Sequence, residues 1–171
     1  MFLINSFFNF LSTENQILLQ DTELIIAVKY GDFKKIRLLV DVLNVNSTNY
    51  YGQTPLMFAA GNGNYKISKT LIRSGANVNL ISDNGYTALM HASEGGHFEI
   101  VKLLVDNAAD ILLENNQGEN VIHLLQKYLY LNRGENINAS YWNTLNFLLL
   151  SKRGAKENAK QISKFFQAGS V

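Results

Sequence analysis

The sequence predicts an all-α solenoid of about four helix-turn-helix units, with short projecting loops and a capping helix at each end. The main observation is a repeat: the segment GQTPLMFAA, which begins at Gly52, returns as GYTALMHAS at Gly85, 33 residues later. The chain also has 12 glycines and one proline, which suits helices that end at glycine better than a β-sandwich. A hydrophobic content of 47% with 17% charged residues is typical of a globular chain.

The repeat extends in both directions from this segment. The same step of 33 residues relates Gly63 to Gly96, Leu71 to Leu104 and Ala76 to Ala109, and a further step reaches Gly118 and Leu125. Toward the N-terminus the step shortens to 32 residues, from Leu24 to Leu56 and from Ala27 to Ala59. Period and residue type agree at many positions, so each unit is one structural repeat that needs its neighbours to bury its apolar surface.

Charge and composition exclude several classes of function. The net charge is +1, from 15 Lys and Arg against 14 Asp and Glu, so we expect no nucleic-acid binding, which needs a basic excess. The chain has no cysteine, which excludes disulfides, thiol nucleophiles and Cys-based metal sites. We expect no cofactor and no small-molecule substrate.

Residues 1–20 are predicted to form an N-terminal capping helix. Apolar residues recur there at helical spacing, at Phe2, Leu3, Phe7, Phe10 and Leu11. A secretory signal is the alternative, but the first basic residue is Lys29 and polar residues interrupt the apolar run. Apolar stretches such as 145–150 are too short to span a membrane. We expect an intracellular protein, with export that reads no N-terminal signal left open.

The second and third units, residues 49–81 and 82–114, show each element clearly. Thr54 and Thr87 stand where a helix N-cap belongs, and Pro55 follows at the first helical position. Gly63 and Gly96 are predicted to turn the chain into a second helix, in a backbone conformation with positive φ. A Gly-Ala pair at 75–76 closes that helix, and an extended loop leads to the next unit.

The terminal units depart from this pattern. The first, residues 21–48, lacks the glycine turn and the Thr-Pro pair. The fourth, residues 115–155, has Asn120-Val121 in place of Thr-Pro and a loop insertion near 132–140, after which a second helix resumes at Tyr141-Trp142. Residues 156–171 are predicted to form a C-terminal capping helix, with Ile162, Phe165 and Phe166 on its apolar face.

These motifs resemble the ankyrin repeat. The segments GQTPLMFAAGNGNYKISKTLIRSGANVN and GYTALMHASEGGHFEIVKLLVDNAADI carry the resemblance, which covers residues 21–125 well. It implies a fold of stacked helix pairs, and protein–protein recognition as the default role. It does not imply any particular partner, because the function of a repeat scaffold depends on its variable surface.

We find no pattern typical of catalysis. His97 lies at a helix junction, where we expect a structural hydrogen bond, and His91 and His123 occupy slightly different repeat positions, so a shared metal is not expected. The acidic residues Asp83, Glu94 and Glu119 fall on loops and helix ends. A phosphate-binding loop and a nucleophile elbow are both absent from the sequence. Turnover lost on His91→Ala would revive an enzymatic hypothesis.

The resemblance implies that the loop tips and the exposed side of the first helices line one concave surface. Mapped by register, its outward positions also include Lys29, Thr48, Asn116 and Lys127. The partner-binding residues predicted on this surface, called the predicted contact set below, are Tyr30, Tyr50, Tyr51, Gln53, Asn62, Asp83, Asn84, Tyr86, Glu94, Gln117, Glu119 and Tyr128. Tyrosine offers a large contact area and loses little rotamer entropy, which favours binding; the alternative is simple tolerance of half-exposed sites near turns.

Three other aromatic residues share one position in the repeat. Phe33, Tyr65 and Phe98 lie two residues after the turn position, and we expect them to be core. The basic residues from position 152 onward are interpreted as a solvated capping helix, with docking to an acidic partner or membrane surface as the alternative.

The sequence therefore predicts a non-enzymatic interaction module that binds another protein and is monomeric when free. The alternatives are a regulatory or inhibitory subunit of a fixed complex, or a microbial protein that acts on host-cell partners.

Overall fold

The computed structural model describes residues 21–40, 44–132 and 138–151 of the chain. Within those ranges it contains eight α-helices and no β-strand, which confirms the all-α fold class. The helices are α2 (Glu23–Lys29), α3 (Phe33–Leu39), α4 (Pro55–Gly61), α5 (Tyr65–Arg73), α6 (Ala88–Glu94), α7 (Phe98–Asp106), α8 (Val121–Leu131) and α9 (Ala139–Leu150). The capping helices predicted for 1–20 and 156–171 lie outside the described residues, as does most of the insertion predicted near 132–140.

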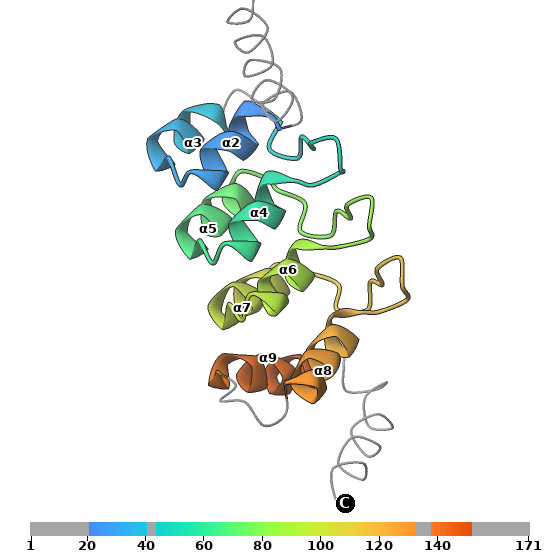
Figure 1. The fold of residues 1–171 in the computed structure, drawn as a ribbon. Coiled ribbons are helices and arrows are strands. Elements are labelled where there is room, and N and C mark those ends of the chain that lie inside the picture. Colours follow the sequence, from blue (N-terminus) through green and yellow to red (C-terminus); the bar gives the residue numbers. More distant parts are fainter. Residues whose placement is uncertain (1–20, 41–43, 133–137, 152–171) are drawn as a thin grey trace, which may run out of the picture.

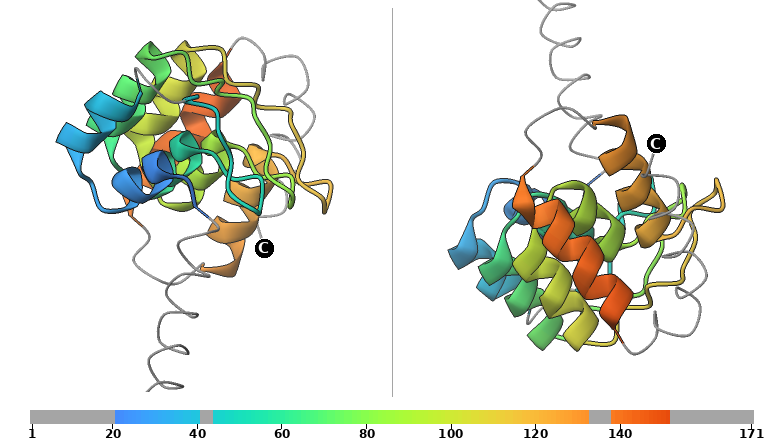
Figure 2. Two further views of the ribbon diagram at one scale, coloured as in Figure 1. Left: turned by 90° about the horizontal axis from the view of Figure 1, so that it is seen from above. Right: turned by 90° about the horizontal axis from the view of Figure 1, so that it is seen from below.

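The helices form two layers that run along one stack. Four pairs follow one another, α2 with α3, α4 with α5, α6 with α7 and α8 with α9, and each pair packs on the next (Figure 1). The first helices α2, α4, α6 and α8 form one layer and the second helices α3, α5, α7 and α9 form the other (Figure 2). Loops that we call fingers, residues 44–54, 77–87 and 110–120, project on the side of the first helices (Figure 1).

One apolar core runs through all four pairs. It begins at Leu24, passes through Leu56, Leu89 and Leu104, and ends at Leu148 in α9. Alanines at 59, 60 and 92 are buried between successive first helices, and their small side chains let these short helices approach closely. Because each pair contacts only its neighbours, the core is continuous along the stack but local in its contacts.

Every first helix begins at a side-chain cap. The cap residues are Thr22, Thr54, Thr87 and Asn120, and each accepts a hydrogen bond from the backbone N–H three residues further on, at 3.1 to 3.3 Å. Such a cap stabilises a helix by about 1 kcal/mol. The caps predicted at Thr54 and Thr87 are confirmed, and Thr22 and Asn120 supply the same bond in the two units that lack Thr-Pro.

Glycine with positive φ joins the two helices in the first three units. Gly63 and Gly96 have φ of +73° and +68°, as predicted. The expectation that the first unit lacks the glycine turn is wrong, because Gly31 turns the chain at φ +68°. At the second of these junctions Nε2 of His97 lies 3.0 Å from the carbonyl oxygen of Gly61, which confirms the structural hydrogen bond predicted for this histidine.

The fourth pair accommodates the insertion by starting its second helix early. α9 begins at Ala139, two residues before the predicted start, because Asn138 caps it by accepting from the N–H of Ser140 at 2.9 Å. The hydroxyl of Ser140 donates to the carbonyl oxygen of Gly96, and the hydroxyl of Tyr141 donates to that of Glu94 at 3.0 Å. These bonds fasten α9 to the turn between α6 and α7.

The aromatic residues at the start of the second helices are not core residues. Tyr65 is 40% exposed, and Phe33 and Phe98 are half-buried. As the first residue of its helix, each ring lies along the outside of the junction instead of between the layers. The ammonium groups of Lys66 and Lys69 lie over the rings of Phe33 and Tyr65, at 4.2 and 5.6 Å from the ring centroids.

Candidate functional site

A single buried polar side chain organises each finger. The three are Asn49, Ser82 and Asn115, at equivalent repeat positions. Oδ1 of Asn49 accepts from the N–H groups two and four residues further on, at 3.0 and 2.9 Å, and Asn115 makes the same two bonds at 2.9 Å. Ser82 is shorter, and its Oγ accepts only from the N–H of Tyr86, at 3.2 Å. The tip of each finger is therefore held by bonds that shield its own backbone.

Successive fingers are also bonded to one another. The N–H of Asp83 donates to the carbonyl of Tyr51 at 3.0 Å, and the N–H of Asn116 donates to the carbonyl of Asn84 at 3.2 Å. The side-chain amide of Asn116 adds a bond of 2.8 Å to the carbonyl of Asp83. The three fingers thus form one ordered edge, so side chains on neighbouring tips keep a constant spacing.

Asparagines at the base of the fingers form a second set of links between units. Oδ1 of Asn46 accepts from the N–H of Asn77, and Oδ1 of Asn79 accepts from the N–H of Asp110, both at 2.7 Å. The next equivalent position is Leu112, whose side chain cannot continue this pattern. The links therefore connect the first three units only.

Two tyrosines of the predicted contact set stand together on the first finger. Tyr50 is 77% exposed and Tyr51 is 52% exposed, and their rings pack edge to face with centroids 5.4 Å apart. Asp83 and Asn84 occupy the same two tip positions on the second finger and are exposed. The structure brings these four residues together at adjoining finger tips.

Other members of the set are bonded within the protein. The hydroxyl of Tyr86 donates to Oε1 of Glu94 at 3.0 Å; burial, followed by this carboxylate, raises the pKa of Tyr86. The ring of Tyr128 stacks on that of Tyr141, with centroids 4.4 Å apart. Both tyrosines were expected to point outward freely, and both are instead held against a neighbour because a partner side chain lies beside each.

The remaining members are divided between the two ends of the first helices. Gln53, Gln117 and Glu119 belong to the finger side, where Gln117 is exposed and the other two are half-buried. Tyr30 and Asn62 are exposed C-caps of α2 and α4, at the far end of first helices that are seven residues long. A helix of that length separates them from the fingers by about 10 Å.

Side chains eight residues apart form a bond across the first helix in three of the four units. Lys29 pairs with Asp21 at 2.5 Å, and Lys127 pairs with Glu119 at 2.6 Å. Hydrogen bonds from Lys127 and then from Asn115 hold the pKa of the Glu119 carboxyl below its ordinary value. Tyr86 and Glu94 are the corresponding pair in the third unit, while the second unit has Gln53 and Gly61 there. The equal spacing in the sequence could have revealed these pairs.

The middle of this surface is less polar. Phe58, His91 and Leu124 occupy one repeat position on α4, α6 and α8, and Nζ of Lys29 lies 4.3 Å from the centroid of the Phe58 ring. His91 packs against Tyr86, with ring centroids 5.4 Å apart. Its Nε2 is buried without a hydrogen-bond partner, and burial lowers the pKa of His91 from 6.5. His91 is therefore neutral at neutral pH.

The lowered pKa of His91 predicts a loss of stability in acid. The unfolded chain binds a proton near pH 6.5 while the folded chain resists it, so the free energy of unfolding falls as the pH drops below 6.5. We expect His91→Phe to be less sensitive to pH over this range than the wild type. Urea denaturation above and below pH 6.5, compared for the two proteins, measures the difference; identical pH dependence would contradict the prediction.

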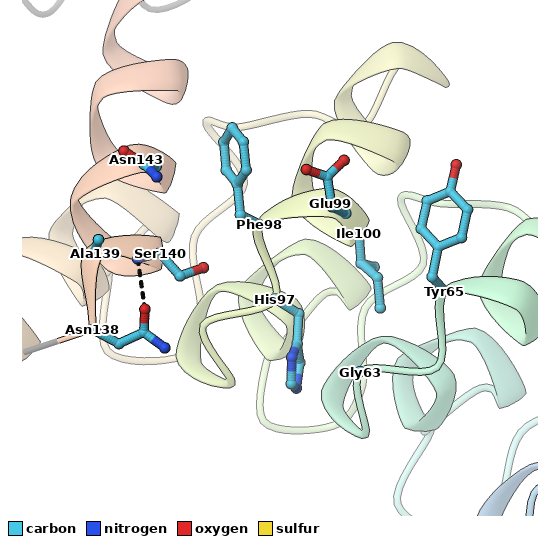
Figure 3. Close-up of a pocket in the computed structure, with 10 residues that line it drawn as sticks. All are labelled: Gly63, Tyr65, His97, Phe98, Glu99, Ile100, Asn138, Ala139, Ser140 and Asn143. Carbon is cyan, nitrogen blue, oxygen red and sulfur yellow. Dashed lines mark hydrogen bonds between the residues drawn. The ribbon is translucent and has the colours of Figure 1, made fainter.

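An open groove lies at the beginnings of α5, α7 and α9 (Figure 3). Its volume is about 490 Å³, and its lining includes Tyr65, His97, Phe98, Asn138 and Asn143. Glu99 projects beside the ring of Phe98 at its rim, and Nε2 of His97 is engaged by Gly61. No group of three or more His, Asp or Glu residues in the described part of the chain could hold a metal ion. The groove brings together no nucleophile and base.

The stacked helix pairs and bonded fingers define an α-solenoid repeat protein. A family model described as ankyrin repeats (three copies) matches residues 2–82, 24–115 and 74–161. The chain belongs to the ankyrin-repeat family, whose repeats generally serve as protein–protein interaction modules. A search of curated proteins found no match to this sequence. None of the helices in the described ranges is long and apolar enough to cross a membrane.

Proposed function

We propose that the protein is a non-catalytic module that binds another protein through the surface formed by its fingers and first helices. The observation that carries this proposal is the exposed Tyr50–Tyr51 pair on a finger whose backbone is fixed by internal bonds. Large exposed aromatic side chains are costly to leave in water and are enriched where proteins bind one another.

The rigidity of the fingers supports this role. Asn49 fixes the tip that carries the two tyrosines, and the bond from Asp83 N–H to the carbonyl of Tyr51 ties that tip to the next finger. A tip that is ordered before binding loses little entropy when a partner covers it. Tyrosine adds only two rotatable side-chain bonds, so most of its contact energy is retained.

The charge of this surface indicates the kind of partner. Its acidic residues are Asp21, Glu23, Asp83, Glu94, Asp110, Glu114 and Glu119, while its basic residues are Lys29 and Lys127. Both lysines are already paired with carboxylates of the surface. We therefore expect a partner whose contact surface is basic, and binding that weakens as salt increases.

Replacing the finger tyrosines tests the proposal. The variant Tyr50→Ala, Tyr51→Ala, Tyr86→Ala is expected to weaken binding of a partner captured from the native source at least about 100-fold, since hot-spot residues each contribute about 2 kcal/mol or more. The partner is first identified by capture with the wild-type protein, and its affinity for both proteins is then measured by calorimetry.

The matched control removes exposed aromatic residues from the opposite layer. Tyr65→Ala, Trp142→Ala changes side chains that are 40% and 43% exposed on α5 and α9. This variant should bind with wild-type affinity. If the finger variant also binds as the wild type does, the partner does not use the fingers and the proposal is wrong.

A further inference from the structure

Charge is sorted between the two helix layers. The second helices α3, α5 and α7 carry seven basic residues, Lys34, Lys35, Arg37, Lys66, Lys69, Arg73 and Lys102, and two acidic ones, Glu99 and Asp106. The first helices and fingers have the opposite balance, with the seven acidic and two basic residues named above. The net charge of +1 conceals this separation.

The basic residues of the second helices have no carboxylate partner among the described residues. The two ion pairs found within those residues, at Lys29 and Lys127, both lie on the finger side of the molecule. Six of the seven bases are exposed, and Lys69 is half-buried beside Tyr65. Unneutralised cations on one layer create a positive potential that attracts anionic groups.

Three of these residues form a straight file across the layer. Arg37, Lys69 and Lys102 occupy the same repeat position on α3, α5 and α7, opposite the buried stripe of each helix. These helices lie side by side in Figure 2. The position just before the file is Lys34 and Lys66 in the first two units but Glu99 in the third, so only the file itself is basic in all three.

The spacing of the file selects the shape of its ligand. Packed helices lie about 8 to 10 Å apart, so one cation follows another at about that distance. An extended or polyproline II chain advances about 3.1 to 3.3 Å per residue, and three residues therefore cover one step. In polyproline II every third side chain also points the same way.

We propose that the file formed by Arg37, Lys69 and Lys102 binds an acidic, extended segment of a partner protein with a carboxylate at every third residue. This site lies on the layer opposite the fingers and does not depend on the proposed function of the finger surface. The guanidinium of Arg37 can hold a carboxylate with two parallel hydrogen bonds, and the two lysines act as point charges.

A protein segment fits this layer better than a bilayer or a nucleic acid. The rings of Phe33 and Tyr65 are covered by the ammonium groups of Lys66 and Lys69, and are therefore not free to insert among lipids. The acidic layer behind the file repels an extended polyanion such as DNA over long distances, whereas a short segment with few carboxylates meets only the file.

Synthetic peptides test the proposal on the full-length protein. One peptide carries three glutamates separated by two neutral residues, and a second has the same composition with the glutamates adjacent. Binding is followed by shifts of the backbone amide resonances of α3, α5 and α7. The spaced peptide should bind roughly tenfold more tightly, because only it pairs all three carboxylates with the file.

Two triple variants with equal loss of charge provide the control. Arg37→Ala, Lys69→Ala, Lys102→Ala should weaken binding of the spaced peptide roughly tenfold, while Lys34→Ala, Lys35→Ala, Arg73→Ala should weaken it less than about threefold. Equal effects of the two variants, or equal binding of the two peptides, would overturn the proposal. So would file-dependent binding of phosphatidylserine vesicles or single-stranded DNA without binding of the spaced peptide.

Discussion

Replacing Gly85 by alanine is expected to lower the free energy of unfolding by about 3 kcal/mol, from backbone strain and steric overlap together. Gly85 has φ of +80° at the root of the second finger. A Cβ atom there would lie 2.7 Å from the Cα atom of Asn115 and from the N atom of Asn116, on the next finger. Backbone atoms cannot move aside as the end of a flexible side chain can, so the fingers would have to separate.

Gly118→Ala is the matched control for this change. Gly118 holds the equivalent position on the third finger at φ +72°, but no atom lies within 4 Å of a Cβ added there. It should lose only about 1 kcal/mol, the cost of left-handed backbone for a residue with a side chain. Urea denaturation followed by circular dichroism measures both variants. Equal losses would mean that close packing between fingers contributes nothing.

Leu104→Ala is expected to cost about 3 kcal/mol, because it leaves a cavity in the core between two units. The side chain of Leu104 has no exposed surface and lies in α7, between α6 and α9. A domain is stable by only about 5 to 15 kcal/mol, so this single change removes a large part of the total. Thermal and urea denaturation give the loss directly.

The control for the core change is Leu38→Ala. Leu38 is 71% exposed on α3, so its replacement should change stability by less than about 0.5 kcal/mol. Hydrogen exchange adds a second measurement: in Leu104→Ala, amides of α6 and α9 should exchange faster than in the wild type, while those of α2 change least. A uniform increase along the stack would contradict the nearest-neighbour organisation of the core.

Two surfaces of opposite charge have consequences for assembly. An acidic finger surface and a basic second-helix layer allow one molecule to bind a basic and an acidic partner at the same time. Because the two layers share the same core, a change at Tyr50 is not expected to alter binding at Arg37. Measuring both affinities in each variant would show whether the two proposals fail independently.

Local features of the fold could be predicted because they depend on short-range rules. Thr87 is an N-cap because its hydroxyl can reach an N–H three residues away, and Gly96 is a turn because residues with side chains avoid positive φ. The start of α9 was predicted two residues late because Asn138, inside an irregular insertion, gave no periodic signal. Tyr65 was assigned to the core because its repeat position is aromatic, although helix geometry places the ring outside.

The candidate surface could be predicted only in part. The register placed Tyr50 and Tyr51 on a finger, but the repeat pattern could not tell that Tyr86 would bond to Glu94 or that Tyr128 would stack on Tyr141. Those contacts depend on where α9 returns after the insertion and on how each side chain rotates. The sequence also suggested that charge runs from an acidic beginning to a basic end, whereas the described residues divide by layer.

The sequence by itself determined that this chain is a stack of four helix pairs of the ankyrin-repeat family, because a 33-residue period with caps and turning glycines specifies each pair locally. Only the tertiary structure decided which side chains are free to bind. Bonds between fingers, pairs across the first helices and the alignment of Arg37, Lys69 and Lys102 all join residues of different units or distant positions. Their geometry is set by the packing of one unit on the next, which no single repeat contains.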